Sequence, residues 1–199
     1  MNLAEALAVV VPLLRDELVV HANGFISRES FNFSDRPGNF YMIGSMGLAS
    51  SIALGVALNR PDRRVVVFDG DGNVLMNLGS LALIGATQPP NLLHVVFDNE
   101  AYGSTGNQRT ISAQVELAEI ARASGYKRVQ RVDTETALQA TAQEFLAQEG
   151  PSFLLVKIVP DHEERKIGRI THAPPQIAAR FKTAISDQQS AVSRSQEKS

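Results

Sequence analysis

Two long apolar runs dominate the pattern of hydrophobic and polar positions along the chain. They are RRVVVFDG, residues 63–70, and NLLHVVFDN, residues 91–99. Near-continuous apolar runs are typical of strands covered on both faces, as in parallel sheets. The segment NVLMNLGSLALIGAT, residues 73–87, lies between them and is predicted to be the crossover helix that two parallel strands require.

The rest of the chain alternates between strand-like and helix-like stretches. Further strands are predicted at 18–22, 40–42, 126–132 and 152–159. Helices are predicted at 3–16 in spite of Pro12, and at 27–31, 47–58, 114–124, 135–148 and 176–185. Because strands and helices alternate, we predict an α/β fold of three layers, α/β/α, with a mainly parallel sheet of about six strands.

The length of the chain limits the number of domains. At 199 residues it can form one sizeable domain, which we predict to span residues 1–186. A charged, proline-containing loop is expected at 161–175. The polar residues 187–199 are expected to form a disordered tail.

Composition narrows the classes of partner. The formal net charge is −2, which does not favour binding to nucleic acid, and no apolar run reaches the ~20 residues that span a bilayer. The chain has no cysteine, which excludes disulfides, thiolate metal sites and cysteine-held iron–sulfur clusters within it. We therefore expect a cytoplasmic protein that has neither a nucleic-acid nor a membrane partner.

Two polar side chains follow the two apolar runs. Asp71 and Asn99 lie 28 residues apart, each at the carboxyl end of a predicted strand. If the strands are neighbours, these side chains converge at the edge of the sheet where ligands collect. Carboxylate and amide oxygens suit Mg²⁺ or Ca²⁺ that also holds phosphate oxygens, and Gly70 and Gly72 permit close backbone approach. The alternative is that both motifs are ordinary turns that end buried strands.

The order and spacing of these motifs resemble the signature of thiamine diphosphate-dependent enzymes, which begins Gly-Asp-Gly and closes with paired Asn, here Asp98-Asn99. The resemblance implies that Asp71, the Asn99 side chain and the Ala101 carbonyl bind Mg²⁺. It also implies a cofactor-binding set that comprises Gly44, Ser45, Met46, Gly70, Asp71, Gly72, Asn73, Asn99, Ala101, Tyr102, Gly103 and Ser104.

The segment GSMG, residues 44–47, also resembles this family. By analogy, Met46 wedges between the two rings of thiamine diphosphate and bends the cofactor, and the Gly44 carbonyl accepts a hydrogen bond from its aminopyrimidine. These two residues are the catalytic candidates. A methionine packed in the core is the alternative for Met46.

Longer stretches resemble the family of sulfopyruvate decarboxylase beta subunits from about residue 15 to 185. They are SRES (27–30), DRPGNFYMIGSMGLASSIALGVAL (35–58), GDGNVLMNLGSLA (70–82), DNEAYGSTGNQ (98–108) and PPQIAARF (174–181). Phosphonopyruvate decarboxylases are similar over the same stretch, but typically have His where this chain has Leu48, and NN…AH where it has DNEAY. Asn73 and Glu100 depart from the usual family pattern. The resemblance implies decarboxylation of a 2-oxoacid, with sulfopyruvate preferred, to sulfoacetaldehyde and carbon dioxide.

Thiamine enzymes also need a glutamate from a pyrimidine-binding domain, for which this chain has no remaining sequence. Glu29 lies beside a predicted site loop but is better explained by a helix cap at Ser27. The resemblance therefore implies a separate alpha subunit and a hetero-oligomer, with self-association as the alternative when the chain is alone.

The substrate-binding candidates are basic. They are Arg28, Arg109 and His21, with surface or structural roles as the alternative for each. Of the other histidines, His94 is predicted to pack in the core, His162 to lie in a solvated loop, and His172 is assigned no role.

Three alternatives stay open. The chain could serve the phosphonopyruvate enzyme or another thiamine-dependent decarboxylase or carboligase that is divided between two chains. A ferredoxin-coupled oxidoreductase is disfavoured by the lack of cysteine. A cofactor-binding regulatory subunit or a nucleotide-binding domain is the non-enzymatic possibility.

Overall fold

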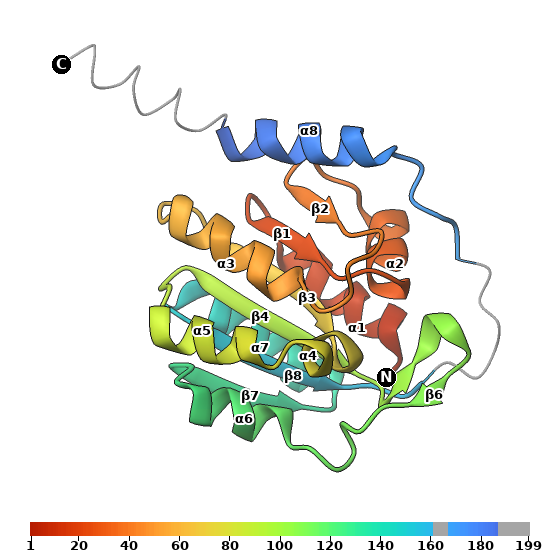
Figure 1. Cartoon of the computed structure of the whole chain (residues 1–199), viewed down its shortest axis with the longest axis vertical. Helices are drawn as coiled ribbons and strands as arrows, with labels where there is room; N and C mark the ends of the chain where they lie inside the picture. Colours follow the sequence, from red (N-terminus) through yellow and green to blue (C-terminus); the bar gives the residue numbers. More distant parts are fainter. Residues whose placement is uncertain (161–166, 187–199) are drawn as a thin grey trace.

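A six-stranded, fully parallel sheet lies between two helical layers, as seen in a computed structural model that describes residues 1–160 and 167–186 (Figure 1). The strand order is β2-β1-β3-β4-β8-β7. The strands are β1 (Leu18–His21), β2 (Asn39–Tyr41), β3 (Val65–Gly70), β4 (Leu92–Asp98), β7 (Arg128–Val132) and β8 (Ser152–Lys157). The predicted α/β/α architecture is confirmed.

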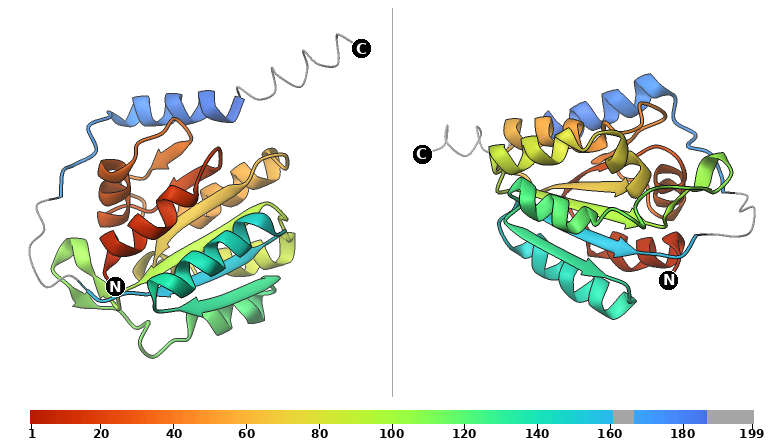
Figure 2. Two further views of the ribbon diagram at one scale, coloured as in Figure 1. Left: turned by 180° about the vertical axis from the view of Figure 1, so that it is seen from behind. Right: turned by 60° about the horizontal axis from the view of Figure 1, so that its bottom comes forward.

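Helices cover both faces of the sheet (Figure 2). One layer contains α3 (Ala49–Asn59), α4 (Asp71–Met76), α5 (Gly79–Thr87) and α6 (Leu117–Ser124). The other contains α1 (Leu3–Val10), α2 (Phe25–Phe33) and α7 (Glu135–Ala147), and α8 (Pro174–Ser186) lies along β2. Buried apolar residues from α1 through α8 join one hydrophobic cluster.

The central strands explain the two apolar runs. Every residue of β3 and β4 is buried, because helices cover the sheet on both sides. The two strands pair in parallel, with Gly70 opposite Phe97 at the carboxyl end. Their last residues therefore lie next to each other at one edge of the sheet.

Two predicted helices differ from the observed ones. The N-terminal α-helix ends at Val10 and continues as the 3₁₀ turn η1 (Val11–Leu13), which contains Pro12, since proline lacks the N–H that an α-helix needs. The crossover at 73–87 is two helices, α4 and α5, rather than one. The break falls at Asn77, whose Nδ2 donates to the Gly47 carbonyl at 3.1 Å.

A small hairpin was not predicted. It consists of β5 (Ala101–Tyr102) and β6 (Gln108–Arg109), joined through the 3₁₀ turn η2 (Gly103–Thr105). Strands of two residues are too short to produce a detectable alternating pattern. The predicted tail at 187–199 and residues 161–166 of the predicted loop, including His162, lie outside the described ranges.

Candidate functional site

A cavity of about 520 Å³ opens at the carboxyl edge of the sheet. It lies where β3 and β4 end and where α2 begins after β1, which is the place where ligands bind in open parallel sheets. Most of the sequence-predicted site residues line it. They are Arg28, Met46, Gly70, Asp71, Gly72, Asn73, Asn99, Ala101, Tyr102, Gly103 and Ser104.

Asp71 and Asn99 are brought to this cavity by neighbouring strands. Asp71 is the first residue of α4, directly after β3, and Asn99 directly follows β4. The parallel register of β3 and β4 makes their ends adjacent, as the spacing of the two motifs predicts. Helix α4 begins at Asp71, two residues before the position at which the sequence pattern places its start.

The Asp71 carboxylate is buried among hydroxyl groups. Its Oδ2 accepts hydrogen bonds from Thr110 Oγ1 at 2.5 Å and from Ser112 Oγ at 3.2 Å. Burial raises the pKa of Asp71 to about 6, the Thr110 hydrogen bond opposes that rise, and the charge of Asp98 adds to it. Because an ion that is desolvated without a cationic partner is unfavourable, a bound divalent cation would stabilise this carboxylate.

The turn after β4 is ordered by its own side chains. Asn99 Oδ1 accepts a hydrogen bond from the Ala101 N–H at 3.1 Å. Ala101 then pairs with Arg109 in the β5–β6 hairpin. This side chain and this strand pair therefore help to fix the course of the backbone through the turn.

Gly72 lies beneath two side chains of the cavity. A Cβ atom at this position would be 2.5 Å from Tyr102 Cε1 and 3.1 Å from Met46 Cε. A larger residue at this position would require the Tyr102 ring to shift, because real Cβ atoms essentially never lie within 3.0 Å of another atom. Asn73 supports the neighbouring loop, because its Oδ1 accepts from the Gly47 N–H at 3.0 Å.

Gly44 and Ser45 are in the exposed loop that leads to Met46 and do not line the cavity. Ser45 has a φ of 57°, a left-handed conformation that non-glycine residues seldom adopt. The loop therefore has a constrained shape at the residue before Met46.

The three substrate candidates have different surroundings. Arg28 lines the cavity, with its guanidinium carbon 5.8 Å from the centre of the Phe25 ring. Arg109 is exposed on β6 and does not line the cavity. His21 also lies outside the cavity wall: it is buried, with Nε2 2.8 Å from Ser30 Oγ and Nδ1 3.3 Å from the Phe40 carbonyl. The geometry thus keeps only Arg28 as a candidate for direct contact.

Three other residues singled out from the sequence lie outside the cavity and make contacts within the fold. His94 is fully buried, as predicted, and its ring nitrogens lie 3.1 Å from Tyr126 Oη and 3.1 Å from Asp69 Oδ2. His172 lies 2.9 Å from Asp35 Oδ2. Ser27 is not a helix cap, because α2 begins after Gly24 and the Ser27 hydroxyl donates to the Ala22 carbonyl at 2.6 Å.

Sequence reasoning missed Thr110 and Ser112. The only signal was their alternation in RTIS, residues 109–112, after a glycine-containing turn. Nothing local indicates that the hairpin returns both hydroxyls to Asp71, 39 and 41 residues earlier in the chain.

The donor set at the cavity fits a hard divalent cation that also binds phosphate oxygens, because it offers a carboxylate, an amide and main-chain carbonyls. Within residues 1–160 and 167–186, no three His, Cys, Asp or Glu side chains form a metal-binding cluster. Because a hard divalent cation takes roughly six oxygens, a cation at this position would also bind oxygens from a ligand or water. Over the same ranges, no helix has both the length and the apolar character needed to cross a bilayer.

Comparisons with known proteins identify relatives of this chain. Residues 24–156 match the family model "Thiamine pyrophosphate enzyme, C-terminal TPP binding domain". The chain is 41% identical over 181 residues to the sulfopyruvate decarboxylase subunit beta of Methanococcus maripaludis, covering 91% of this chain and 96% of that protein. It is 44% identical over 173 residues to the phosphonopyruvate decarboxylase of Streptomyces viridochromogenes, covering 87% of this chain but only 43% of that protein.

The benzoylformate decarboxylase of Polynucleobacter necessarius has the same fold. The TM-score is 0.68 at 19% sequence identity, over 82% of this chain and 34% of that one. At this identity the likeness concerns the fold alone.

Proposed function

Because this chain belongs to the thiamine pyrophosphate enzymes and carries their C-terminal TPP-binding domain, we propose that it is one subunit of a two-subunit, thiamine diphosphate-dependent 2-oxoacid decarboxylase. The proposed substrate is sulfopyruvate, and the products are sulfoacetaldehyde and carbon dioxide. The observation that carries this proposal is the match along 96% of a sulfopyruvate decarboxylase beta subunit, with Asp71 and Asn99 lining one cavity.

The partner is an alpha subunit that carries a pyrimidine-binding domain and the catalytic glutamate. The name "subunit beta" of the relative supports a second chain. The cavity supports it too, because it opens at the molecular surface, where a second protein can cover it. That residues 1–186 form the complete cofactor-binding domain, and that the complex is cytoplasmic, stay predictions.

Asp71, Asn99 and the Ala101 carbonyl would hold Mg²⁺ and, through it, the diphosphate. Thr110 orients the Asp71 carboxylate by donating to Oδ2, and the Ser112 hydroxyl lies 3.2 Å from the same oxygen. Gly72 keeps the floor of the cavity open beneath Tyr102 and Met46. When bound, thiamine diphosphate supplies a thiazolium carbon that accepts electrons as carbon dioxide leaves.

Met46 and Gly44 would shape the bound cofactor. The Met46 side chain projects into the cavity from the loop between β2 and α3, and α4 supports this loop through Asn73. With the cofactor bound, the apolar methionine would exclude water from this part of the cavity, and a desolvated site would favour loss of a charged carboxylate. The Gly44 carbonyl would accept a hydrogen bond from the aminopyrimidine once the partner closes the site.

Arg28 is the proposed partner for the acidic end of the substrate. A guanidinium can donate two parallel hydrogen bonds to a sulfonate, as it does to a carboxylate or phosphate. Its place in the cavity wall, at the start of α2, supports this role.

Phosphonopyruvate is the second candidate substrate. The 44% identity to a phosphonopyruvate decarboxylase favours it as strongly as the 41% identity favours sulfopyruvate. Sulfopyruvate is preferred because Leu48 and the segment DNEAY (98–102) depart from the pattern typical of phosphonopyruvate decarboxylases.

Titration of thiamine diphosphate tests the cofactor assignment. The chain, reconstituted with its partner subunit, is expected to bind the cofactor in a Mg²⁺-dependent manner that calorimetry can follow. Asp71→Asn keeps the size of the side chain but removes its charge, and should weaken binding at least tenfold, the range typical of altered metal sites. Asp133→Asn, at an exposed residue after β7, is the control and should bind as the wild type does. Equal affinity of wild type and Asp71→Asn would refute the proposed metal site.

A further inference from the structure

A lysine outside the predicted site joins the two residues that flank Asn99. Lys157, the last residue of β8, lies directly opposite Asp98 in the parallel register of β4 and β8. Its Nζ donates to Asp98 Oδ2 at 2.9 Å and to Glu100 Oε1 at 2.7 Å. One ammonium group therefore bridges the residue before Asn99 and the residue after it.

The Lys157–Asp98 part of the bridge is shielded from solvent, whereas the Glu100 side chain is 36% exposed. The Lys157 side chain is 18% exposed and the Asp98 side chain 3%. Such partly buried ion pairs are screened less by salt than pairs on the surface, and their geometry is held more tightly. Lys157 therefore differs from Lys127 and Lys182, which are exposed.

The turn that it bridges has an unusual backbone. Glu100 has a φ of 57°, in the left-handed region that disfavours residues with a side chain. Such a conformation persists only where the surroundings impose it. Here the Glu100 N–H donates to Asp98 Oδ1 at 3.1 Å, and the Glu100 carboxylate is held by Lys157.

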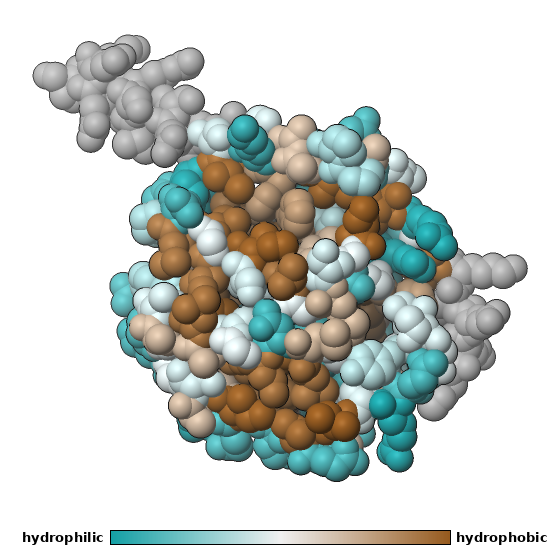
Figure 3. Space-filling model, in the orientation of Figure 1, coloured by the Kyte–Doolittle hydropathy of each residue, from teal (hydrophilic) through white to brown (hydrophobic). Residues whose placement is uncertain are grey.

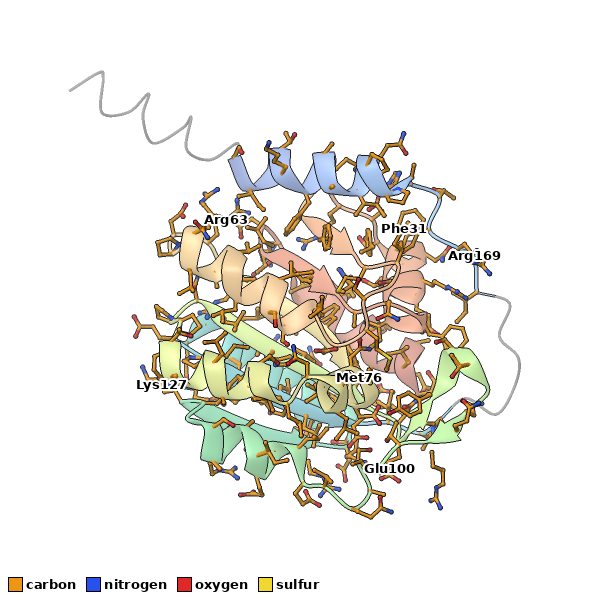
Figure 4. The ribbon with its side chains drawn as sticks, viewed as in Figure 1. Phe31, Arg63, Met76, Glu100, Lys127 and Arg169 are labelled. Atoms are coloured by element: carbon orange, nitrogen blue, oxygen red, sulfur yellow. The ribbon has the colours of Figure 1, made fainter. Side chains whose placement is uncertain are left out.

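The same cluster extends to Asp71. Ser112 Oγ lies 2.8 Å from Asp98 Oδ1 and 3.2 Å from Asp71 Oδ2. The Glu100 carbonyl accepts from the N–H of Thr110, whose hydroxyl donates to Asp71. A displacement of the Asp98–Glu100 turn would therefore also disturb the hydroxyls that orient Asp71. Figure 4 shows Glu100 at the carboxyl edge of the sheet, near the ends of β4 and β8.

We propose that Lys157 is a positioning residue that links Asp98 and Glu100 through its two ion pairs. By fixing this turn, it holds Asn99 and the Ala101 carbonyl in their cation-binding arrangement. This inference rests on the proposed function, because it assigns Mg²⁺ to this edge. Lys157 does not touch the cation or the substrate. It acts on the turn that presents the ligands.

The direction in which cation affinity changes when Lys157 is replaced distinguishes a positioning role from a purely electrostatic one. Removing an ammonium group leaves Asp98 and Glu100 without their cation, so the site becomes more negative. Charge alone would then make a divalent cation bind more tightly. Loss of positioning makes it bind more weakly.

The test measures Mn²⁺ in place of Mg²⁺ by electron paramagnetic resonance of the free ion, with thiamine diphosphate present and the chain reconstituted with its partner. Lys157→Met should raise the dissociation constant of Mn²⁺ by about 10–100-fold, the range seen when outer partners of metal ligands are removed. Lys157→Arg keeps the charge and can reach both carboxylates, so it should recover most of the affinity.

Lys127→Met is the matched control. Lys127 forms an exposed pair with Glu149 at 3.6 Å, beside the amino end of β7 and far from Glu100 (Figure 4). This variant should bind Mn²⁺ within about twofold of the wild type, since exposed ion pairs contribute little. Circular dichroism and thermal melting establish that each variant is folded.

A folded Lys157→Met protein that binds Mn²⁺ as tightly as the wild type, or more tightly, would overturn the positioning role. If the methionine variant does not fold, Lys157→Gln gives the same contrast, because it removes the charge and keeps one donor. A wild-type complex that binds no Mn²⁺ in the presence of thiamine diphosphate would overturn the proposed function itself, together with this role.

Discussion

His21 shows how the surroundings of a single residue can differ from what its place in the chain suggests. It ends β1 at the same edge of the sheet as Asp71, yet its ring packs 4.7 Å from that of Tyr41 and contacts Ser30 and Phe40. Burial lowers the pKa of His21 from 6.5 to about 3, because desolvation disfavours the imidazolium. Its surroundings favour a role in stability rather than in substrate binding.

The shifted pKa predicts how stability depends on pH. Below pH 6.5 the unfolded chain binds a proton at His21, whereas the folded chain does not until about pH 3, so acid favours unfolding. Between pH 7 and pH 5 this residue alone should lower the free energy of unfolding by about 2 kcal/mol. Urea denaturation at both pH values should show that loss in the wild type, and a correspondingly smaller loss in His21→Gln. Equal losses in the two proteins would refute the assignment.

Helices α5 and α6 pack more closely than their sequences indicate. A Cβ atom on Gly85 would lie 1.8 Å from the carbonyl oxygen of Ser124, a backbone atom that cannot rotate away. The contact joins the end of α6 to the face of α5, in the helical layer over β4 and β8. Gly85 is therefore required by packing between helices, in spite of its low helix propensity.

Two glycine substitutions test this contact. Gly85→Ala should destabilise the protein by about 3 kcal/mol, because the helices must separate to accommodate the methyl group. Gly55→Ala, at an exposed position of α3 with no atom within 4 Å of the new Cβ, should instead stabilise it by about 0.5–1 kcal/mol. Thermal or urea unfolding measures both. If the two variants changed stability in the same direction, the close approach of α5 and α6 would be wrong.

At the scale of the whole molecule, one face carries large exposed apolar side chains. Leu48, Leu58, Met76 and Leu83 belong to or adjoin α3, α4 and α5. Figure 3 shows apolar surface over these helices. Exposed apolar surface of this kind is typical of protein interfaces, and it agrees with a chain that works in a complex.

The proposed function assigns the diphosphate-binding domain and the catalytic glutamate to different subunits, and this predicts the activity of the isolated chain. The isolated chain should release carbon dioxide from sulfopyruvate at less than about 1% of the rate of the reconstituted complex, because general acid–base groups contribute about 10²–10⁴-fold and the glutamate is absent. Within the complex, kcat/KM for sulfopyruvate should exceed those for phosphonopyruvate and pyruvate at least about tenfold. The Asp71→Asn complex is the control for background decarboxylation. Full activity of the isolated chain would exclude the requirement for an alpha subunit.

The parallel sheet, and the edge at which Asp71 and Asn99 lie, follow from the local pattern of the chain. Apolar runs mark β3 and β4, and Asp71 and Asn99 follow them directly, so their location at one edge depends only on local pattern and on the parallel arrangement. The break of the crossover at Asn77 was not predictable, because it depends on a hydrogen bond to Gly47, 30 residues away.

Only the tertiary structure decided which residues surround the two predicted ligands. Thr110 and Ser112 reach Asp71 through a hairpin whose strands are too short to be detected, and Lys157 reaches Asp98 and Glu100 because β8 pairs with β4. The burial of His21 likewise depends on α2 and β2. The physical reason is the same in each case: periodicity and strand ends are properties of neighbours in the chain, whereas strand order brings together residues that are far apart in it.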